Sequence, residues 1–411
     1  MDVTLIAPNV GIFTLRQPYS LHCMTVAKRL ASMGNTVRVI TSGDSDVTYY
    51  VEEVEVTSLN ASTRSFFKHK EVFKRIRSET DVVCSYFPVI CSAELVRLGS
   101  LLNRPLTNVI FTDKITAQDL IGSFQMWAGG IGAPNFEGYF PYNLARLCYP
   151  DSALQCSLRS EYVSRFIVPS EHLRSRIIGR SPSRYRKALE EKITVIRGGV
   201  DTKAFDPKRR YSSTSIGSPL KPTSKDRVIL FFGSDLQGRG LTDLVEAVSH
   251  VKREMKVKLV ALVAGPKSAG LAWRCAQKLS LSEDTLIVNN VLDEEDLAAY
   301  LQLADVIALP FRHYWSMADS PFVLFEGMSM GKPVITTRLG AIPELIESGV
   351  TGILYDPRNS ALLWKILIRL LEKPYAMRLL GENARQKAVQ DYDWGRVTQA
   401  MEKTLESVLS G

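Results

Sequence analysis

Residues 227–255 read RVILFFGSDLQGRGLTDLVEAVSHVKREM, and this stretch decides the fold. Arg227 to Phe232 is a short, mostly apolar run, which predicts a buried strand. A glycine-rich turn follows it. Leu241 to Met255 then repeats apolar residues at helical spacing, which predicts an amphipathic helix. A buried strand, a glycine turn and a helix together form one unit of a parallel sheet that is covered by helices.

The same alternation of strand and helix continues on both sides of this unit. In the second half, the expected strands are Lys258 to Ala264, Thr285 to Val288, Val306 to Leu309, Pro333 to Thr337 and Gly352 to Tyr355. In the first half, they are Val3 to Ala7, Thr36 to Thr41, Asp81 to Tyr86, Asn108 to Thr112, Arg165 to Pro169 and Ile193 to Ile196. A helix is expected from Ser20, as its N-cap, to Met33, with Gly34 in the left-handed position beyond its end. The fold class is therefore α/β, with two Rossmann-like, doubly wound parallel sheets.

A polar stretch separates the two halves. Residues 208–226 are rich in Ser and Pro, which predicts a linker. We therefore expect an N-terminal domain over residues 1–207 and a C-terminal domain over residues 227–393. Ligands of such sheets bind beyond the carboxyl ends of the strands, so two sheets that face each other would hold a ligand in the cleft between them.

The composition indicates a globular protein with an anionic partner. The 411 residues suggest two or three domains, and 45% of them are hydrophobic. The net charge of +8 favours a nucleotide or an acidic lipid surface, and no nucleic-acid-binding motif accompanies it. There is no basic leader, and the longest apolar runs are about half the roughly 20 residues that span a bilayer, which predicts a cytoplasmic protein. The six cysteines form no C-x-x-C pair, so zinc and dithiol motifs are not expected.

Residues 317–331 read Met-Ala-Asp-Ser-Pro-Phe-Val-Leu-Phe-Glu-Gly-Met-Ser-Met-Gly and predict a helix with an anion site at its start. Ser320 suits the N-cap, and Pro321 suits the first turn because its missing N–H is not needed there. The amides of Phe322 and Val323, at the positive end of the helix, would bind a diphosphate. Glu326, one turn further in, can accept hydrogen bonds from ribose hydroxyls. The alternative is an ordinary capped helix with a structural glutamate.

A second candidate segment follows the strand that opened this section. Gly233, Gly238 and Gly240 allow close approach of the backbone to a ligand. Arg239 lies between the last two of these glycines, just before the helix, and a guanidinium suits bidentate contact with phosphate oxygens. Taken alone, a glycine-rich turn between strand and helix is a weak signal, since it is neither G-x-G-x-x-G nor a Walker loop.

Together these segments resemble the retaining, family-4 glycosyltransferases of the GT-B fold (glycosyl transferases group 1). The resemblance is strongest from Arg227 to Trp394, where several motifs occur in the family's order. They are Phe-Phe-Gly-Ser…Gly-Arg-Gly, Leu-Ala-Asp-Val-Ile-Ala-Leu-Pro at 303–310, Ser-Pro-Phe-Val-Leu-Phe-Glu-Gly-Met-Ser-Met-Gly-Lys-Pro-Val-Ile at 320–335, Gly-Ala-Ile-Pro-Glu-Leu-Ile at 340–346 and Gly-Ile-Leu-Tyr-Asp-Pro at 352–357. Weaker matches lie at 166–171 and 199–205. The resemblance also implies that a helix within residues 394–411 crosses back and completes the first domain.

The resemblance implies a site for a nucleotide-diphosphate sugar as donor substrate. It assigns Gly233 and Arg239 to the diphosphate and Glu326 to the ribose. Backbone groups near Leu292 would meet the base, and Gly11 would approach the phosphates from the first domain.

Three positions depart from the family pattern. The family has a glutamate eight positions before Glu326, whereas this sequence has Ala318 with Asp319 beside it. Asp319 is the candidate to replace that carboxylate in contacts with the donor sugar. The family's arginine after the strand glycine is Ser234 here, and its loop lysine is Arg239, which keeps the charge. We therefore expect Arg239, Asp319 and Glu326 to carry the catalysis, with Ser234 among the donor-binding residues.

The resemblance implies a retaining hexosyltransferase that needs no cofactor and no metal. Negative charge grows on the leaving diphosphate, and Arg239 with the helix start at Pro321 would stabilise it. Asp44-Ser45-Asp46 matches the D-x-D metal motif of the other glycosyltransferase fold. It follows the second strand in a polar turn, however, so we expect a solvated turn.

The acceptor is expected to be a glycan or a lipid-linked glycan bound by the first domain. Asp113 ends a strand and can orient or deprotonate an acceptor hydroxyl, or else simply cap a helix. Residues 118–142 form a glycine- and aromatic-rich stretch that suits either acceptor binding or packing. Residues 66–77 mix aromatics with cations at helical spacing. They suit either a helix lying on anionic lipid, which would attach the protein to the inner face of the membrane, or an ordinary domain helix.

Two other functions fit part of the sequence. A sugar-nucleotide epimerase of similar fold would need acid and base groups around the sugar, yet only His22 and His313 of the five histidines lie near the expected cleft loops. A non-catalytic nucleotide-sugar-binding protein is suggested by Ala318.

Overall fold

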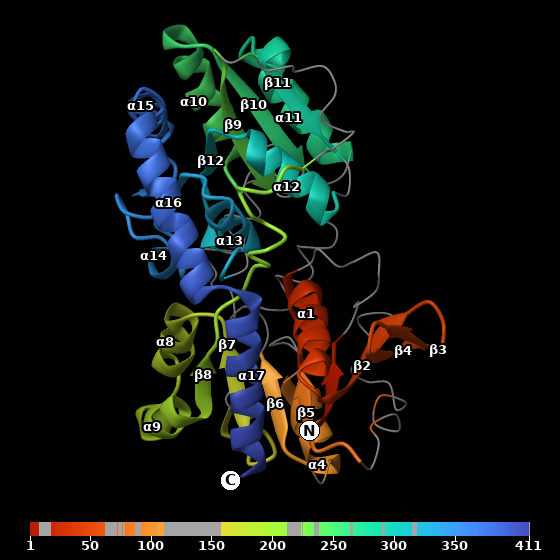
Figure 1. Cartoon of the computed structure of the whole chain (residues 1–411). Coiled ribbons are helices and arrows are strands. Elements are labelled where there is room, and N and C mark those ends of the chain that lie inside the picture. The colour runs from red at the N-terminus through yellow and green to blue at the C-terminus, as the bar shows by residue number, and fades with distance from the viewer. Residues whose placement is uncertain are drawn as a thin grey trace. The chain divides into compact units, whose positions relative to one another are not determined.

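The computed structural model describes residues 1–7, 18–61, 72, 76, 79–86, 92–102, 104–110, 158–211, 223, 225–233, 238–263, 266–289, 292–314 and 319–410. The chain divides into two compact units (Figure 1). Unit 1 lies within residues 1–114, 144–199 and 394–411, and the described part of unit 2 lies within residues 200–393. Among these described residues, no helix is both long enough and apolar enough to cross a membrane.

Unit 1 is built on an eight-stranded sheet in the order β3-β4-β2-β1-β5-β6-β7-β8. Every neighbouring pair is parallel except β3 and β4. Leu5 at the centre pairs with Val39 on one side and with Cys84 on the other, and all three side chains are fully buried. The strands are β1 (Asp2–Ile6), β2 (Thr36–Gly43), β3 (Val47–Val51), β4 (Val54–Asn60), β5 (Val82–Ser85), β6 (Leu106–Val109), β7 (Arg165–Val168) and β8 (Ile193–Val195).

The hairpin of β3 and β4 is the part of this sheet that the sequence did not predict. The turn at Asp44-Ser45-Asp46 leads directly into it. The carboxylate of Asp46 accepts a hydrogen bond from the Asn60 amide at 2.9 Å, which closes the end of the hairpin. This turn therefore has a structural role within the sheet, and the described residues contain no group of acidic, His or Cys side chains that could hold a metal ion.

Helices α1 (Pro18–Ser32), α4 (Ser92–Leu101), α8 (Glu171–Gly179), α9 (Ser183–Lys192) and α17 (Trp394–Leu409) complete the described part of unit 1. α1 begins at Pro18, so Ser20 lies inside the helix and is not its N-cap as expected. Gly34 follows α1 with φ of 92°, the left-handed conformation that the sequence predicted. α17, the C-terminal helix, packs against α1, and Asn35 donates to Glu402 across this contact at 2.7 Å (Figure 1).

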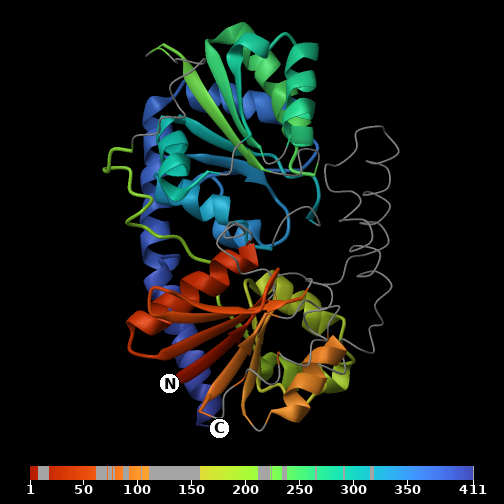
Figure 2. The same ribbon diagram turned by 90° about the vertical axis from the view of Figure 1, so that its right-hand side faces the viewer.

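Unit 2 has a six-stranded parallel sheet in the order β11-β10-β9-β12-β13-β14, and its strands are coloured from light green for β9 to blue for β14 in Figure 2. The strands are β9 (Arg227–Gly233), β10 (Val257–Val263), β11 (Thr285–Val288), β12 (Val306–Leu309), β13 (Val334–Thr337) and β14 (Ile353–Tyr355). The strand order reverses between β9 and β12. In doubly wound sheets, this switch point is where ligands bind.

Alternating residues of β9 supply the two cores of unit 2. Val228 and Leu230 belong to one hydrophobic cluster, together with residues of α12 (Glu294–Leu303) and α13 (Phe322–Ser329). Ile229 and Phe231 belong to the other, together with residues of α10 (Leu241–Glu254), α11 (Pro266–Lys278) and α15 (Ser360–Leu371). A strand with both faces covered needs an almost continuous apolar run, which is the pattern that decided the fold. Unit 2 is completed by α14 (Ile342–Leu345), α16 (Pro374–Asp391) and a short 3₁₀ turn, Ser282–Asp284.

The chain passes between the two units after Gly199 and again after Asp393. Just beyond the first passage, the Val200 amide donates to the carbonyl of Tyr392 at 2.8 Å, and Phe205 lies in the core of unit 2. The expected end of the first domain at residue 207 therefore falls inside unit 2. The Ser/Pro-rich composition marks a polar segment that follows this passage and does not mark the passage itself.

Candidate functional site

The described end of the loop between β9 and α10, residues 238–240, lies against the chain that follows β12. Gly240 has φ of 76° and is the N-cap of α10. A Cβ at this position would lie 1.9 Å from the carbonyl oxygen of Pro310, so only glycine allows the two backbones to approach this closely. The amide of Arg312 also donates to the carbonyl of Gly238 at 2.7 Å. Gly238 and Gly240 are thus held against the chain after β12, at the switch point of the sheet.

Arg239 lies in this loop, and its side chain folds back over Gly233. A Cβ at Gly233 would lie 2.3 Å from Cδ of Arg239, so the arginine occupies the space that a larger residue would fill. Its guanidinium carbon is 5.8 Å from the centre of the Phe311 ring, within reach of a cation–π interaction. Gly233 and Arg239 therefore lie together, at the carboxyl end of β9.

Helix α13 follows the β12 loop and runs from Phe322 to Ser329. Its N-cap is Pro321 and not Ser320, and the Pro321 side chain makes no capping hydrogen bond, which corrects the prediction that Ser320 is the N-cap. Pro321 supplies an extended conformation without an N–H. The amides of Phe322 and Val323 form the first turn, so the positive end of the helix dipole lies at these residues.

Glu326 and Leu292 occupy different environments. Glu326 is half-buried, one turn into α13, as the sequence predicted. The next residue, Gly327, packs closely on β12, since a Cβ there would lie 2.6 Å from the Ile307 side chain. Leu292 is buried in the core and directly precedes Asp293, the N-cap of α12. The Leu292 side chain is thus part of the core, and the resemblance assigns a contact with the nucleotide base to the backbone near it.

Asp319 is fully buried, which the sequence did not indicate. Its Oδ1 accepts a hydrogen bond from the hydroxyl of Tyr314 at 2.6 Å. The resemblance makes Asp319 a contact for the donor sugar, whereas the structure gives it a partner from its own unit. Tyr314 carries no motif of its own, so the pairing could not be found from the sequence.

Another missed group lies beside the Arg239 loop. The Asp243 side chain, in the first turn of α10, is 14% exposed, and its Oδ2 lies 3.4 Å from Nε of Arg312. Burial raises the pKa of Asp243, and the nearby Arg312 partly opposes this shift. His313 directly follows Arg312 in the chain, and its Nδ1 lies 2.9 Å from Nη2 of Arg358. These contacts link the ends of β12 and β14 to the start of α10.

His22 cannot serve as an acid or base in contact with solvent. It is buried in unit 1, where its Nδ1 lies 2.9 Å from the Tyr86 hydroxyl and its ring meets that of Trp394 edge to face. Burial lowers the pKa of His22 to about 3. This environment argues against the use of His22 in an epimerase reaction.

Several expected residues lie outside the described part of the chain. They are Gly11, Asp113, Ser234 and Ala318, the stretch 118–142, and all of 66–77 except Val72 and Ile76.

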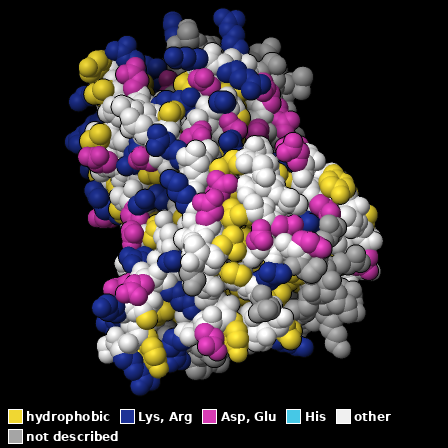
Figure 3. Space-filling view, turned by 60° about the horizontal axis from the view of Figure 1, so that its bottom comes forward, with side chains coloured by type: hydrophobic (Ala, Val, Ile, Leu, Met, Phe, Trp, Pro, Cys, Tyr) yellow, Lys and Arg dark blue, Asp and Glu magenta, His cyan; other side chains and the backbone are white. Residues whose placement is uncertain are grey.

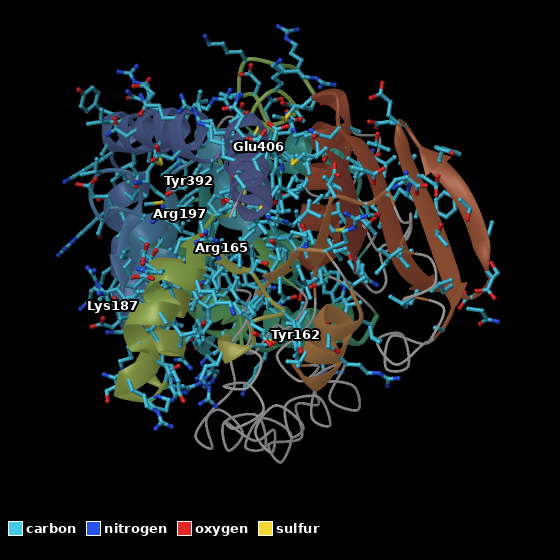
Figure 4. All side chains as sticks on the ribbon, turned by 90° about the horizontal axis from the view of Figure 1, so that it is seen from below. Tyr162, Arg165, Lys187, Arg197, Tyr392 and Glu406 are labelled. Atoms are coloured by element: carbon cyan, nitrogen blue, oxygen red, sulfur yellow. The ribbon has the colours of Figure 1, made fainter. Side chains whose placement is uncertain are left out.

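The described basic surface of unit 1 has a structural explanation. Residues 172–189 contain six cations and no Asp or Glu, and Figure 3 shows many Lys and Arg side chains on the face seen from below. Arg174 donates to the carbonyl of Glu190 and Arg186 to that of Gly179, at the ends of α9 and α8, respectively. Arg165 donates to the carbonyl of Glu191, whereas Lys187 lies further out (Figure 4). Cations at helix C-termini offset the negative end of the dipole, so part of the positive charge serves the fold.

Comparisons with known proteins point to one family. Residues 226–373 match the family model for "Glycosyl transferases group 1". The chain is 29% identical over 221 residues to the MMP alpha-(1->4)-mannosyltransferase of Mycolicibacterium hassiacum, which covers 54% of this chain and 49% of that protein. It is 27% identical over 210 residues to the glycogen synthase of Mycobacterium tuberculosis, which covers 51% of this chain and 47% of that protein. The chain thus spans about half the length of the curated relatives it matches.

Solved structures resemble the chain over its whole length. The sucrose-phosphate synthase of Thermosynechococcus elongatus has a TM-score of 0.75 at 17% identity and covers 100% of this chain and 99% of that one. Anabaena Alr3699/HepE in complex with UDP and glucose has a TM-score of 0.70 at 16% identity and covers 99% of this chain and 100% of that one. At these identities, the likeness shows the fold. Residues 226–373 of the chain therefore match glycosyl transferases group 1, and the chain has the GT-B fold.

Proposed function

We propose that the protein is a retaining glycosyltransferase that moves a hexosyl group from a nucleotide-diphosphate sugar to a hydroxyl of a glycan or lipid-linked glycan. One observation carries the proposal: Arg239 follows β9 and α13 is the helix that follows β12, and these two strands meet at the switch point of the sheet. A guanidinium and the positive end of a helix there suit a diphosphate. The names of the relatives support the same reaction class, and HepE of similar fold was solved with UDP-glucose.

The reaction follows from where charge develops. The bond between C1 of the sugar and the diphosphate oxygen breaks, and the electron pair leaves with the nucleoside diphosphate. Arg239 and the amides of Phe322 and Val323 stabilise that growing charge. The acceptor oxygen bonds to C1 on the face that the diphosphate leaves, and its proton passes to the departing phosphate or to a base. The configuration at C1 is retained, and the products are the glycoside and the nucleoside diphosphate.

The remaining donor contacts belong to the same proposal. Glu326 accepts hydrogen bonds from the ribose, and the backbone near Leu292 meets the base. Gly11 and Ser234 approach the phosphates, and Asp113 orients the acceptor hydroxyl. Because Arg239 and the helix end supply positive charge to the diphosphate, we propose that the transfer needs no bound metal.

Nucleotide-sugar binding is the first step to test. A thermal-shift screen of UDP-, GDP- and ADP-sugars should give one base that raises the melting temperature. A ligand at 100 times its dissociation constant stabilises the folded state by about 2.7 kcal/mol. The sugar nucleotide that binds is then incubated with a panel of glycan and lipid-linked acceptors, and NMR gives the configuration at C1 of any product.

The possible outcomes separate three functions. An α-linked product from an α-linked donor supports a retaining transferase. Net formation of an epimer without acceptor would indicate an epimerase, and binding without turnover across the panel would indicate a non-catalytic binder. Sedimentation with anionic liposomes at low and high salt tests the further proposal that residues 66–77 attach the protein to a membrane from the cytoplasmic side.

A further inference from the structure

The N-cap residue of α13 makes no side-chain hydrogen bond to the first turn, which is also true of α9, α10, α14 and α16. α8, α12 and α15 each begin with a side chain that accepts a hydrogen bond from the first turn, namely Ser170, Asp293 and Asn359. The N-cap of α13 is Pro321, whose side chain has no oxygen that could accept such a bond. A helix start that is to bind an anion must nevertheless keep its amides in a fixed direction.

Tyr314 and Asp319 make a contact that can fix this direction. Asp319 lies two residues before Pro321 and has no exposed surface. The Tyr314 hydroxyl donates to its Oδ1 at 2.6 Å, the short distance typical of a hydroxyl bonded to a carboxylate. This bond links the chain after β12 directly to the residues that enter α13.

The ring of Tyr314 is in turn held by a third segment. Gly340, between β13 and α14, has φ of 53°, which favours glycine. A Cβ at Gly340 would lie 2.5 Å from two carbons of the Tyr314 ring and 3.6 Å from Oδ1 of Asp319. The Tyr314 ring therefore packs directly against the Gly340 backbone, in the space that a side chain at this position would fill. It cannot move closer to that backbone.

We propose that Tyr314 and Asp319 are positioning residues for the diphosphate site, holding the start of α13 so that its amides point at the terminal phosphate. This rests on the proposed function above. In this role Asp319 does not contact the donor sugar, because its buried carboxylate is used to hold the protein chain. Gly340 contributes to the same positioning because the Tyr314 ring packs on its backbone.

The test compares nucleotide affinities of Tyr314→Phe with those of the wild type. Calorimetric titrations with UDP, GDP and ADP identify the diphosphate that the wild type binds, and the matching monophosphate is titrated next. Tyr314→Phe removes only the hydroxyl and keeps the ring on Gly340. We expect the diphosphate to bind about tenfold more weakly, which is the typical loss of a hydrogen bond to a charged group. The monophosphate should lose less, since the base and ribose contacts remain.

Tyr211→Phe is the matched control. Tyr211 is also in unit 2, and its hydroxyl bonds to the carbonyl oxygens of Ala204 and Asp206, at 2.6 and 3.0 Å. Its loss should lower the melting temperature but leave both nucleotide affinities unchanged. If Tyr314→Phe behaves in the same way as this control, the hydroxyl has only a structural role and the proposal is wrong.

Asp319→Asn separates positioning from contact with the sugar. A positioning role predicts that the variant weakens binding of the nucleoside diphosphate and of its sugar conjugate by the same factor. Weakening confined to the sugar conjugate would show that Asp319 contacts the sugar and would overturn the proposal. If the wild type itself binds none of the nucleotides, the proposed function fails, and this inference falls with it.

Discussion

A Cβ added at Gly381 would lie 2.0 Å from the carbonyl oxygen of Gly331. Helix α16 and the chain leaving α13 are thus in contact backbone to backbone. Beside this contact, Arg385 of α16 donates to the carbonyl of Ser329 at 2.9 Å and to that of Phe205 at 2.8 Å. The C-terminal end of α13 is therefore fixed by these contacts, while its N-terminal end forms the proposed anion site.

The contact between Gly381 and Gly331 predicts that one methyl group added at Gly381 lowers the unfolding free energy substantially. Gly381→Ala must push α16 away from α13, and overpacking of this kind costs about 1–3 kcal/mol of unfolding free energy. Urea denaturation measures it. Gly270→Ala is the control, because the nearest atom to a Cβ in that helix is 3.9 Å away and alanine should stabilise it by about 0.5–1 kcal/mol. Equal stability of the two variants would contradict the contact.

Among the side chains of unit 2, Arg239 should contribute most to the turnover rate. Removing one preorganised donor to a developing charge typically lowers turnover by about 10²–10³, so Arg239→Ala should lose that much. Arg378→Ala, which removes an exposed cation of α16 whose Nε lies 3.8 Å from Glu382, is the control and should keep its turnover. Initial rates at saturating donor and acceptor decide the matter. Turnover of Arg239→Ala within tenfold of the wild type would remove Arg239 from this role.

Gly233 should act through Arg239. Gly233→Ala places a methyl group 2.3 Å from Cδ of Arg239, and this flexible side chain can move aside at little cost in stability. We expect near-normal melting without ligand but weaker binding of the nucleoside diphosphate, because the guanidinium has moved. In the Arg239→Ala background, the same substitution should have almost no further effect on binding, which a double-mutant cycle measures. Additive losses would show that Gly233 contacts the ligand by itself.

Most of the architecture could be predicted because buried parallel strands are continuous apolar runs. Each of the six strands expected in the second half is present, and β9 and α10 lie where residues 227–255 placed them. The hairpin of β3 and β4 was missed, since β3 is an edge strand with only partly buried residues and carries no long apolar run. The position of the passage between the units was also missed, because it depends on the packing of Val200 and Phe205 and not on composition.

The candidate site was predictable only where one segment suffices to define it. The Arg239 loop and α13 each have a local pattern of glycine, proline and helical spacing, and both are present. The N-cap was assigned wrongly because Ser320 and Pro321 both suit the start of a helix, and only the backbone geometry chooses between them. The pair of Tyr314 and Asp319 needs Gly340, which comes from another loop, so no local pattern reveals it.

The pH dependence of stability should depend on His22. Burial lowers its pKa from 6.5 to about 3 in the folded state, whereas the unfolded state has the ordinary value. Between these two values the unfolded state binds a proton that the folded state does not, so the unfolding free energy falls as the pH falls from about 6.5 toward 3. Above pH 6.5, His22 is neutral in both the folded and the unfolded state, so burying it does not lower the unfolding free energy through its titration. At pH 5, the loss from this one group should be about 2 kcal/mol.

His22→Gln tests this prediction because glutamine can still bond to the Tyr86 hydroxyl but does not titrate. Urea denaturation at pH 7 and pH 5 gives the stability change of each protein, and subtracting the two changes removes the contribution of all other groups. The wild type should lose about 2 kcal/mol more than the variant between these pH values. Lys28→Gln is a control. Lys28 lies on the same helix, and its 2.7 Å ion pair with Glu52 is at the surface. The stability of this variant should therefore depend on pH in the same way as that of the wild type. If His22→Gln loses as much stability as the wild type, the imidazole is not the group that titrates, and the acid sensitivity of unit 1 has another origin.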